Sequence, residues 1–376
     1  MNTWFRTTAV VLFLICALTI EVKGQRPSWI TSPEIHPDKS VTFRYRAPQA
    51  DTVKLSAEFL RESRLMTQDT SGIWSITVDS IDPDINPYFF IVDGTNVADP
   101  NNPDIFPNER FKRSLLDLPG NKPLIHSKQD VPHGKISYEY YTSESLGLTR
   151  PVVVYTPPGY EENTGTKYPV LYLIHGMTDT HETWYKVGRI NFILDNLIAQ
   201  DKAEPMIVVM PYANPFPALM KNDPDMEMDL LRTDPFTEDL AKDVIPYTEE
   251  NYRTIENAAH RAIAGFSLGG RQILAAGLGY PEMFSYVCAF SPAVWEREFQ
   301  DNFTNLYASS ETLNRKLNLL WLSCGTEDML YDSAQALAAA FDERGIEYTS
   351  SFPGGGHTWM NVRDYMSETA QLLFQE

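Results

Sequence analysis

Cysteine, basic residues and long apolar segments are all scarce in this chain of 376 residues. Three cysteines are present, and 31 lysines and arginines stand against 50 aspartates and glutamates, a formal net charge of −19 at pH 7. Two cysteines, Cys288 and Cys324, lie in or beside apolar runs typical of core strands, so buried free thiols are expected rather than a disulfide framework. So acidic a chain is a poor partner for nucleic acid or an anionic membrane.

The one extended apolar run, from Ala9 to Ile20, is too short to span a bilayer, so no membrane anchor is expected. Arg6 precedes the run, and Val22-Lys23-Gly24 follows it. This order of basic, apolar and small residues is that of a secretory signal peptide. The sequence therefore predicts a signal peptide over residues 1–24 and a secreted or periplasmic product.

Residues 25–118 consist of short runs in which apolar and polar residues alternate. Such runs, separated by turn signals such as Asp93-Gly94, are typical of strands in a small β-sandwich. The predicted strands are residues 41–45, 53–55, 74–78 and 88–92. Residues 119–130, with two prolines and a glycine, predict a linker.

From residue 131 to 376 the pattern changes to apolar runs without strong alternation, separated by amphipathic stretches. Strands buried on both faces have such runs. We therefore expect an α/β fold, a mostly parallel sheet with helices on both faces. The predicted strands are 152–155, 170–174, 206–210, 262–264, 286–290, 319–323 and 348–352, and the helix candidates are 189–199, 236–252 and 333–344.

The pentapeptide Gly265-Phe266-Ser267-Leu268-Gly269 has the G-x-S-x-G pattern, and it stands between a predicted strand and a predicted helix. In this context the serine occupies a tight turn that pushes its hydroxyl outward, a nucleophile elbow. Glycines two positions before and after it let strand and helix approach closely. Ser267 is therefore the predicted nucleophile.

An activated serine needs a base and a third group that orients the base. His357 follows three glycines just past the last predicted strand, and in α/β-hydrolases the histidine comes last in the chain. The acid is expected on the loop after strand 319–323, where Asp328 is preferred, and Glu327 and Asp332 stay open as alternatives.

A tetrahedral oxyanion needs two backbone N–H donors. One is expected from Leu268, directly after the nucleophile, and the other from Met177, which follows His175-Gly176 at the end of strand 170–174. No cysteine, histidine and acid cluster has metal spacing, and no phosphate-binding glycine loop is present. The expected chemistry therefore requires neither a metal nor a cofactor.

These motifs resemble carbohydrate esterase family 1, the feruloyl and acetyl xylan esterases in the esterase D group of α/β-hydrolases. The resemblance covers nearly all of residues 131–376. It rests on residues 168–176, 244–247, 261–270, 324–328 and 356–357. It implies the triad Ser267, Asp328 and His357.

The N-terminal segment, in turn, resembles the immunoglobulin-like sandwich related to family 48 carbohydrate-binding modules. Its Tyr88-to-Gly94 strand and turn, followed by Asp99-Pro100, carry the likeness. Trp74 is either a sugar-stacking residue or, more often for a lone tryptophan in such a strand, part of the core.

The long connection after strand 206–210 carries apolar and methionine side chains suited to an adaptable wall around an aromatic acyl group. Phe216 and Met220 on this connection, with Trp295 and Trp359 elsewhere, are the expected substrate contacts. The sequence predicts a serine esterase that releases ferulate from arabinoxylan, a plant cell-wall polysaccharide. Alternatives are an acetyl xylan esterase, an enterochelin-type siderophore esterase, an acyltransferase, or a catalytically silent glycan-binding protein.

Overall fold

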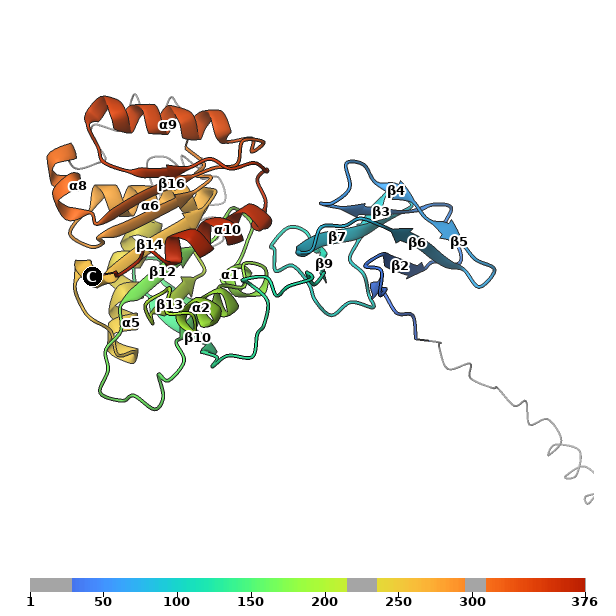
Figure 1. Ribbon diagram of the computed structural model, residues 1–376, viewed down its shortest axis with the longest axis horizontal. Helices are drawn as coiled ribbons and strands as arrows, with labels where there is room; N and C mark the ends of the chain where they lie inside the picture. Colours follow the sequence, from blue (N-terminus) through green and yellow to red (C-terminus); the bar gives the residue numbers. More distant parts are fainter. Residues whose placement is uncertain (1–28, 215–234, 295–308, 376) are drawn as a thin grey trace, which may run out of the picture.

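The computed structural model describes residues 29–214, 235–294 and 309–375 (Figure 1). The predicted signal peptide and three predicted substrate contacts, Phe216, Met220 and Trp295, therefore lie outside the described residues. Within the described ranges, no helix combines the length and apolarity needed to cross a membrane.

Two antiparallel sheets form the first part of the structure, which we call the N-terminal β region (residues 34–117). All four predicted strands of this region are present. One sheet has the order β1 (Glu34–Ile35), β2 (Val41–Arg46), β6 (Ile73–Val78), β5 (Thr67–Gln68). The other has the order β4 (Arg64–Leu65), β3 (Val53–Ala57), β7 (Ile85–Val92), β8 (Thr95–Val97), and β9 (Ser114–Asp117) also pairs with β7.

Alternate residues of these strands form a shared core between the two sheets, as a period of two requires. Phe43, Leu55 and Phe90 are fully buried in it. Trp74 belongs to the same core. It is 7% exposed, and its indole N–H donates to the Ala47 carbonyl at 2.9 Å, which leaves the ring unavailable for stacking on a sugar.

The second part, which we call the C-terminal α/β region (residues 135–375), is built on one eight-stranded sheet. Its order is β10 (Lys135–Ser143), β11 (Leu148–Thr156), β13 (Ile207–Pro211), β12 (Val170–Ile174), β14 (Arg261–Phe266), β15 (Tyr286–Phe290), β16 (Leu319–Ser323), β17 (Thr349–Ser351). The pairs β10–β11 and β11–β13 are antiparallel, and every other neighbouring pair is parallel. The predicted α/β fold with a mostly parallel sheet is confirmed.

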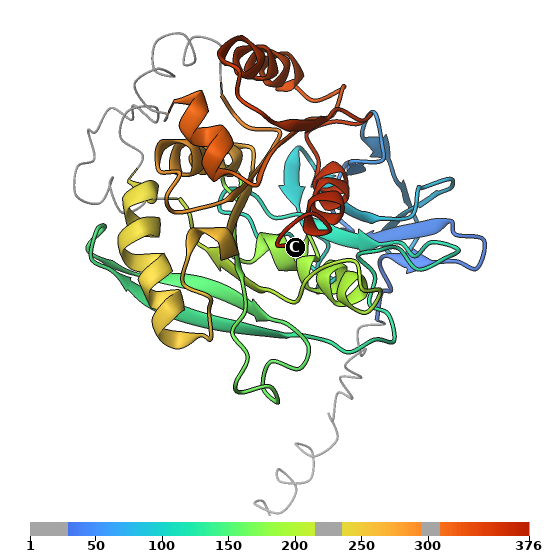
Figure 2. The same cartoon turned by 60° about the vertical axis from the view of Figure 1, so that its left-hand side comes forward.

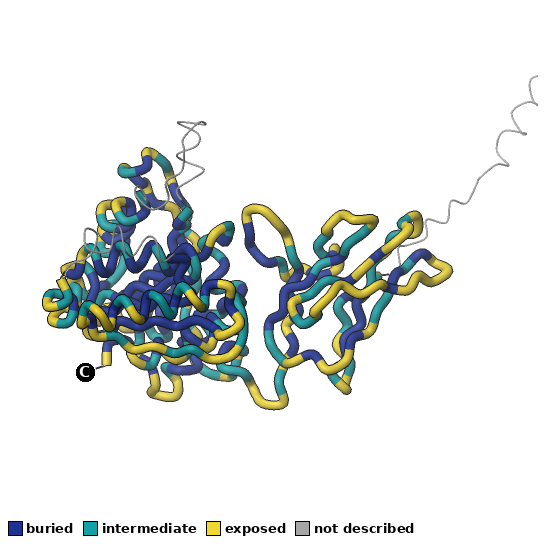
Figure 3. The backbone as a smooth tube through the Cα atoms, turned by 90° about the horizontal axis from the view of Figure 1, so that it is seen from above, coloured by how far each residue is buried: buried dark blue, intermediate teal, exposed yellow. Residues whose placement is uncertain are grey.

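Helices cover both faces of this sheet (Figures 1 and 2). One face packs on α1 (Thr183–Lys186), α2 (Ile190–Ile198) and α10 (Trp359–Ala370). The other packs on α4 (Phe236–Asp239), η1 (Leu240–Val244), α5 (Ile245–Asn251), α6 (Leu268–Gly279), α8 (Ser310–Lys316) and α9 (Tyr331–Arg344); a short 3-10 turn, η2 (Ala258–His260), precedes β14. The central strands are consequently buried on both sides, as the tube coloured by burial shows (Figure 3). Cys288 and Cys324 are buried and unpaired, as predicted.

Several elements differ from the sequence prediction, among them one helix and one strand. The helix expected over residues 236–252 is interrupted, because residues 240–244 form a π-helical turn between α4 and α5. Strand β10 was not predicted at all. It is the edge strand of the sheet, and Tyr138 and Tyr140 on it are exposed, so it lacks the continuous apolar run of its buried neighbours.

The N-terminal β region contacts the end of the C-terminal α/β region that carries α1 and α10 (Figure 1). Arg363 on α10 is 1% exposed and donates to the Val187 carbonyl at 2.8 Å within its own region. It also donates to the Ile85 carbonyl at 3.1 Å and pairs with Asp84, both in the N-terminal β region. A buried guanidinium is costly unless it is paired, so the ion pair with Asp84 and the hydrogen bond to Ile85 fix the two regions to each other.

Candidate active site

Ser267 stands between β14 and α6 with φ 58° and ψ −117°, outside the regions that ordinary L-residues occupy. Backbone hydrogen bonds to the neighbouring strand β15 and to the residues just after it hold this turn. The Ser267 N–H donates to the Phe290 carbonyl at 3.0 Å, and the Ser267 carbonyl accepts from Ala293 N–H at 2.9 Å. Such strain persists only where the surroundings over-determine it, and here it presents the hydroxyl at the carboxyl end of the sheet.

The flanking glycines are required by close backbone approaches. A Cβ on Gly265 would lie 2.5 Å from the carbonyl carbon of Gly269, and a Cβ on Gly269 would lie 2.4 Å from the carbonyl oxygen of Ile174. Both distances are far below van der Waals contact, so neither position accepts a side chain without a backbone shift. The G-x-S-x-G pattern is thus explained by the geometry of the turn.

His357 and Asp328 come together from two loops that follow β17 and β16. The His357 Nδ1 lies 3.0 Å from Asp328 Oδ1 and 2.9 Å from Oδ2. The imidazole also packs on Phe266, the residue before the serine, with ring centroids 4.5 Å apart. The structure thus brings the predicted base to the predicted acid and places it beside the strand end that carries the nucleophile.

Of the three acids considered on the β16 loop, Asp328 alone is buried. Its side chain is inaccessible to solvent, whereas Glu327 and Asp332 are exposed. Burial raises the pKa of Asp328, but hydrogen bonds from His357 and the Leu330 N–H outweigh burial and hold the pKa below its usual value. Asp328 is therefore ionised at neutral pH and oriented toward the imidazole.

The loop after β12 approaches the serine from another side. A Cβ on Gly176 would lie 3.4 Å from the Ser267 Cβ, so the loop and the nucleophile are in van der Waals range. Met177 follows in this loop with a side chain that is 49% exposed. Leu268 is the first residue of α6, where N–H groups lack intrahelical acceptors. The two predicted oxyanion donors thus belong to segments on either side of Ser267 in the fold.

His175 links this loop to the segment after β13, a role that its sequence position did not reveal. Burial lowers its pKa to about 4, so the ring is neutral. Its Nδ1 lies 2.9 Å from the Gly176 carbonyl oxygen and its Nε2 accepts from Ala213 N–H at 2.9 Å. The first contact requires a proton on Nδ1 and the second excludes one from Nε2, which fixes the tautomer.

Trp359 does not lie where the sequence interpretation put it. The side chain is 5% exposed and packs edge-on against Trp184 and Phe266, with ring centroids 4.9 and 5.5 Å apart. Almost no ring surface is available to an acyl group. The assignment of Trp359 as a substrate contact is corrected, because the residue supports the site from the core.

Sequence reasoning also missed Asp179, three residues after Gly176, and its partner Asn108. Both are buried, and the Asn108 amide lies 3.3 Å from Asp179 Oδ1. The sequence shows that Asp179 follows the carboxyl end of a predicted strand, but it does not show that the residue is buried or which residue is its partner. Asn108 gave no sequence signal, because it belongs to the N-terminal β region, 71 positions away along the chain.

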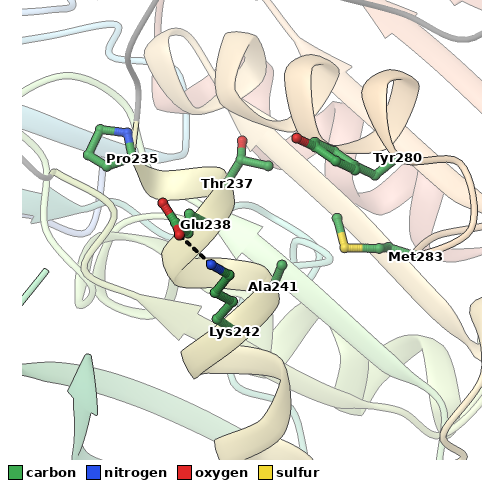
Figure 4. A pocket seen from close by; sticks show the side chains of 7 residues that line it. All are labelled: Pro235, Thr237, Glu238, Ala241, Lys242, Tyr280 and Met283. Carbon is green, nitrogen blue, oxygen red and sulfur yellow. Dashed lines mark hydrogen bonds and ion pairs between the residues drawn. The ribbon is translucent and has the colours of Figure 1, made fainter. Parts of the chain in front are cut away.

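A separate cavity of about 530 Å³ lies between α4–η1 and the end of α6 (Figure 4). It is lined by Pro235, Thr237, Glu238, Ala241, Lys242, Tyr280 and Met283. Glu238 and Lys242 form an ion pair across one helical turn. None of the predicted catalytic residues lines this cavity, so it is not the candidate active site.

Comparison with known proteins agrees with this geometry. The model of the Esterase family, described as "Putative esterase", matches residues 143–369. An endo-1,4-beta-xylanase/feruloyl esterase of Xylanibacter ruminicola is 28% identical over 355 residues, which is 91% of this chain and 46% of the relative. The chain therefore spans less than half the length of that relative.

Two solved structures illustrate the fold. A CE1 ferulic acid esterase of Anaeromyces mucronatus superposes with a TM-score of 0.56 at 24% identity, over 66% of this chain and 94% of its own. The enterobactin esterase of Shigella flexneri superposes with a TM-score of 0.67 at 19% identity, over 89% of this chain and 93% of its own. The chain belongs to the Esterase family and has the α/β-hydrolase fold.

Proposed function

We propose that this esterase hydrolyses hydroxycinnamoyl esters, feruloyl groups on arabinoxylan in particular, with Ser267, His357 and Asp328 as its triad. The observation that carries the triad is the contact of His357 Nδ1 with both oxygens of buried Asp328, beside a serine in the elbow conformation. The name of the Xylanibacter relative, which includes feruloyl esterase, supports the substrate class.

In the acylation step, Ser267 Oγ attacks the ester carbonyl carbon while His357 Nε2 takes the hydroxyl proton. Asp328 stays ionised, accepts a hydrogen bond from His357 Nδ1–H and stabilises the imidazolium. The tetrahedral oxyanion accepts hydrogen bonds from the Leu268 and Met177 N–H groups. Collapse breaks the bond to the sugar oxygen, which leaves as an alcohol with the proton from His357.

In the deacylation step, water replaces the sugar alcohol. His357 takes one proton from the water, the hydroxide oxygen attacks the acyl carbon, and the second collapse returns the proton to Ser267 Oγ. The products are ferulate and the free enzyme. No redox change and no further reactant is involved.

An aromatic acyl group offers the site more apolar surface than an acetyl group. Burying a hydroxycinnamate ring is worth about 1.5–3 kcal/mol, which corresponds to about 10- to 150-fold in kcat/KM. Phe216, Met220 and Trp295 stay predicted ring contacts, since they lie outside the described residues. We expect methyl ferulate to be hydrolysed at least about tenfold more efficiently than methyl acetate.

The direct test is product analysis after incubation with destarched wheat-bran arabinoxylan. Release of ferulate by the wild type and its loss in Ser267→Ala are expected. Release of acetate in preference to ferulate would replace this proposal with an acetyl xylan esterase. Formation of a new ester when an alcohol acceptor is added would identify an acyltransferase.

A siderophore esterase is the second candidate, because the enterobactin esterase superposes on both regions of this chain. Enterobactin hydrolysis, measured beside methyl ferulate at equal concentration, separates the two candidates. The described site does not support a silent glycan-binding protein, since the buried Asp328–His357 pair beside the elbow serine has the geometry for catalysis. Absence of activity on any p-nitrophenyl ester would nevertheless favour that reading.

A polymeric wall substrate requires an enzyme outside the cytoplasm, which agrees with the signal peptide proposed for residues 1–24. N-terminal sequencing of the exported protein tests this part of the proposal, and a chain that starts at Gln25 is expected.

A further inference from the structure

A segment of the N-terminal β region reaches the loop that carries the proposed oxyanion donor Met177. After β8 the chain leaves its own sheet, and residues 107–109 run beside residues 178–179. Asn108 and Asp179 form an antiparallel bridge, and the Glu109 N–H donates to the Thr178 carbonyl at 2.7 Å. Pro107 adds a third link, because its carbonyl accepts from Thr183 Oγ1 at 3.0 Å.

The side chain of Asn108 uses all of its hydrogen-bonding groups in this contact. Its amide donates to Thr178 Oγ1 at 2.9 Å and to Asp179 Oδ1 at 3.3 Å. Its carbonyl oxygen accepts from the N–H groups of Arg110 at 2.9 Å and Phe111 at 3.3 Å. The residue is 1% exposed, so these partners replace water completely.

The loop needs such support because its backbone is strained. Thr178 has φ +66°, a left-handed conformation that is a true outlier for a β-branched residue. Strained residues persist where the surrounding structure over-determines them. The two hydrogen bonds from Asn108 and Glu109 act on Thr178 itself, one on its side chain and one on its carbonyl.

Asp179 connects this support to the nucleophile. Its N–H donates to the Gly176 carbonyl at 3.2 Å, which closes the loop around Met177. One carboxyl oxygen lies 3.5 Å from the Cβ position of Gly176, and that position is 3.4 Å from the Ser267 Cβ. Burial raises the pKa of Asp179 to about 8, although hydrogen bonds from Asn108 and Trp359 oppose the shift.

Glu109 braces a second segment beside the site. Its carboxylate accepts from the Tyr212 hydroxyl and from the Asn214 amide, the latter at 3.0 and 2.9 Å to its two oxygens. Tyr212 stacks on His175 with ring centroids 5.6 Å apart, and His175 in turn contacts the Gly176 carbonyl. Both segments that Asn108 and Glu109 hold thus converge on residues 175–179.

We propose that Asn108 is a positioning residue for ester hydrolysis, which holds the loop of residues 176–179 so that the Met177 N–H faces the oxyanion. The N-terminal β region is then part of the catalytic machinery, whatever it also does with polysaccharide. The inference rests on the proposed roles of Ser267 and Met177. It predicts that even a small ester, too short to touch the N-terminal β region, is hydrolysed slowly when Asn108 is lost.

The size of the expected fall in kcat follows from what is lost when an oxyanion donor is removed. Removing one such donor lowers kcat by about 10²- to 10³-fold, and a displaced donor loses part of that. For Asn108→Ala in the full chain we expect kcat on p-nitrophenyl acetate to fall by about 10- to 100-fold, with KM within about threefold of wild type. The control is Asn96→Ala, an exposed position of the same region, for which no change is expected.

If Asn108→Ala folds poorly, exchanging the side chains of Asn108 and Asp179 still tests the positioning role. Asn108→Asp replaces the amide that donates to Thr178 and Asp179 with an acceptor, so kcat should fall at least as far as in the alanine variant. Adding Asp179→Asn restores one amide and one carboxyl group in reverse order. The double variant should therefore recover kcat at least about tenfold over Asn108→Asp, which a general loss of stability would not produce.

Either of two results would overturn the inference: kcat of Asn108→Ala within twofold of wild type, or a double variant no faster than Asn108→Asp. All rates are taken well below the melting temperature of each variant, so that unfolding does not contribute. The proposed function is tested separately by Ser267→Ala. If Ser267→Ala keeps its activity, the triad assignment is wrong. If Ser267→Ala is inactive but the Asn108 variants have wild-type kcat, only the positioning role of Asn108 is wrong.

Discussion

Two loops at the carboxyl end of the eight-stranded sheet each carry a buried aspartate, and the two carboxyl groups have opposite charge states. Asp328, after β16, has its pKa lowered below the usual value by His357 and a backbone N–H despite burial. Asp179, after β12, has its pKa raised to about 8, because burial exceeds the hydrogen bonds that it accepts. Similar burial thus gives a charged group in one loop and a neutral group in the other.

The difference lies in the partners. Asp328 faces the His357 imidazole, which becomes a cation in the proposed mechanism, so a fixed negative charge is useful there. Asp179 faces the amide of Asn108 and the indole of Trp359, which are neutral, and Glu109 nearby adds negative charge. A carboxyl group in such surroundings is a hydrogen-bonding link. We infer that the Asp328 loop contributes a charged group to the proposed catalysis, whereas the Asp179 loop contributes a neutral hydrogen-bonding link that maintains the loop geometry.

The largest effect is expected from substituting the proposed triad partners of Asp328. Ser267→Ala and His357→Ala should each lower kcat by about four orders of magnitude or more, because nucleophile and base act as one unit. The double variant should be no slower than either single variant. Steady-state kinetics on p-nitrophenyl acetate check this, and a double variant far slower than both would show that the two residues act independently.

A smaller effect is expected where the elbow meets the Asp179 loop. Gly269→Ala places a Cβ 2.4 Å from the Ile174 carbonyl oxygen, just before His175, so the backbone must move. We expect the free energy of unfolding to fall by about 1–3 kcal/mol, with loss of activity. Denaturant-induced unfolding of the wild type and the variant measures this difference in the free energy of unfolding. Gly165→Ala is the matched control, because no atom lies within 4 Å of its Cβ position, and an equal loss there would refute the steric explanation.

The smallest effects distinguish the two aspartates by the pH dependence of stability. The raised pKa of Asp179 means that its neutral form stabilises the fold. This contribution is complete below the unfolded value of 3.8 and is lost as pH rises toward about 8. Asp179→Asn cannot ionise, so its stability relative to wild type should improve steadily between pH 4 and 8.

Asp328 should show the opposite sign. Its lowered pKa gives a contribution that is present above 3.8 and is lost as pH falls through the lower folded value. The loss of stability that Asp328→Asn causes relative to wild type should therefore become smaller as the pH falls. Thermal melts of the wild type and both variants across pH 3 to 8 decide the matter, and parallel slopes for the two variants would contradict the assigned charge states.

The Asp328 loop and the elbow were predictable from sequence because their signals are local. Ser267 stands in a G-x-S-x-G pentapeptide between a strand and a helix, and the runs at 170–174, 286–290 and 319–323 match β12, β15 and β16. Among the neighbouring acids on one short loop, by contrast, only burial and the contact with His357 single out Asp328.

The Asp179 loop was not predictable, since what fixes it lies in another region of the chain. Asn108 is polar, isolated and 71 positions from Asp179, so neither periodicity nor a motif reveals it. Trp359 misled for a related reason: being next to His357 suggested a substrate contact, but α10 begins there and turns the ring into the core. Sequence neighbours of a catalytic residue need not share its surface.

The most direct test of this account compares kcat for Asp328→Asn and Asp179→Asn on p-nitrophenyl acetate at pH 7. Asparagine at position 328 removes the charge that orients and stabilises the imidazolium, so a loss of about three to four orders of magnitude is predicted. At position 179 the wild-type group is already neutral, so the amide should cost no more than about tenfold. Losses of equal size at the two positions, or a greater loss at position 179, would contradict the division between a charged catalytic aspartate and a neutral positioning one.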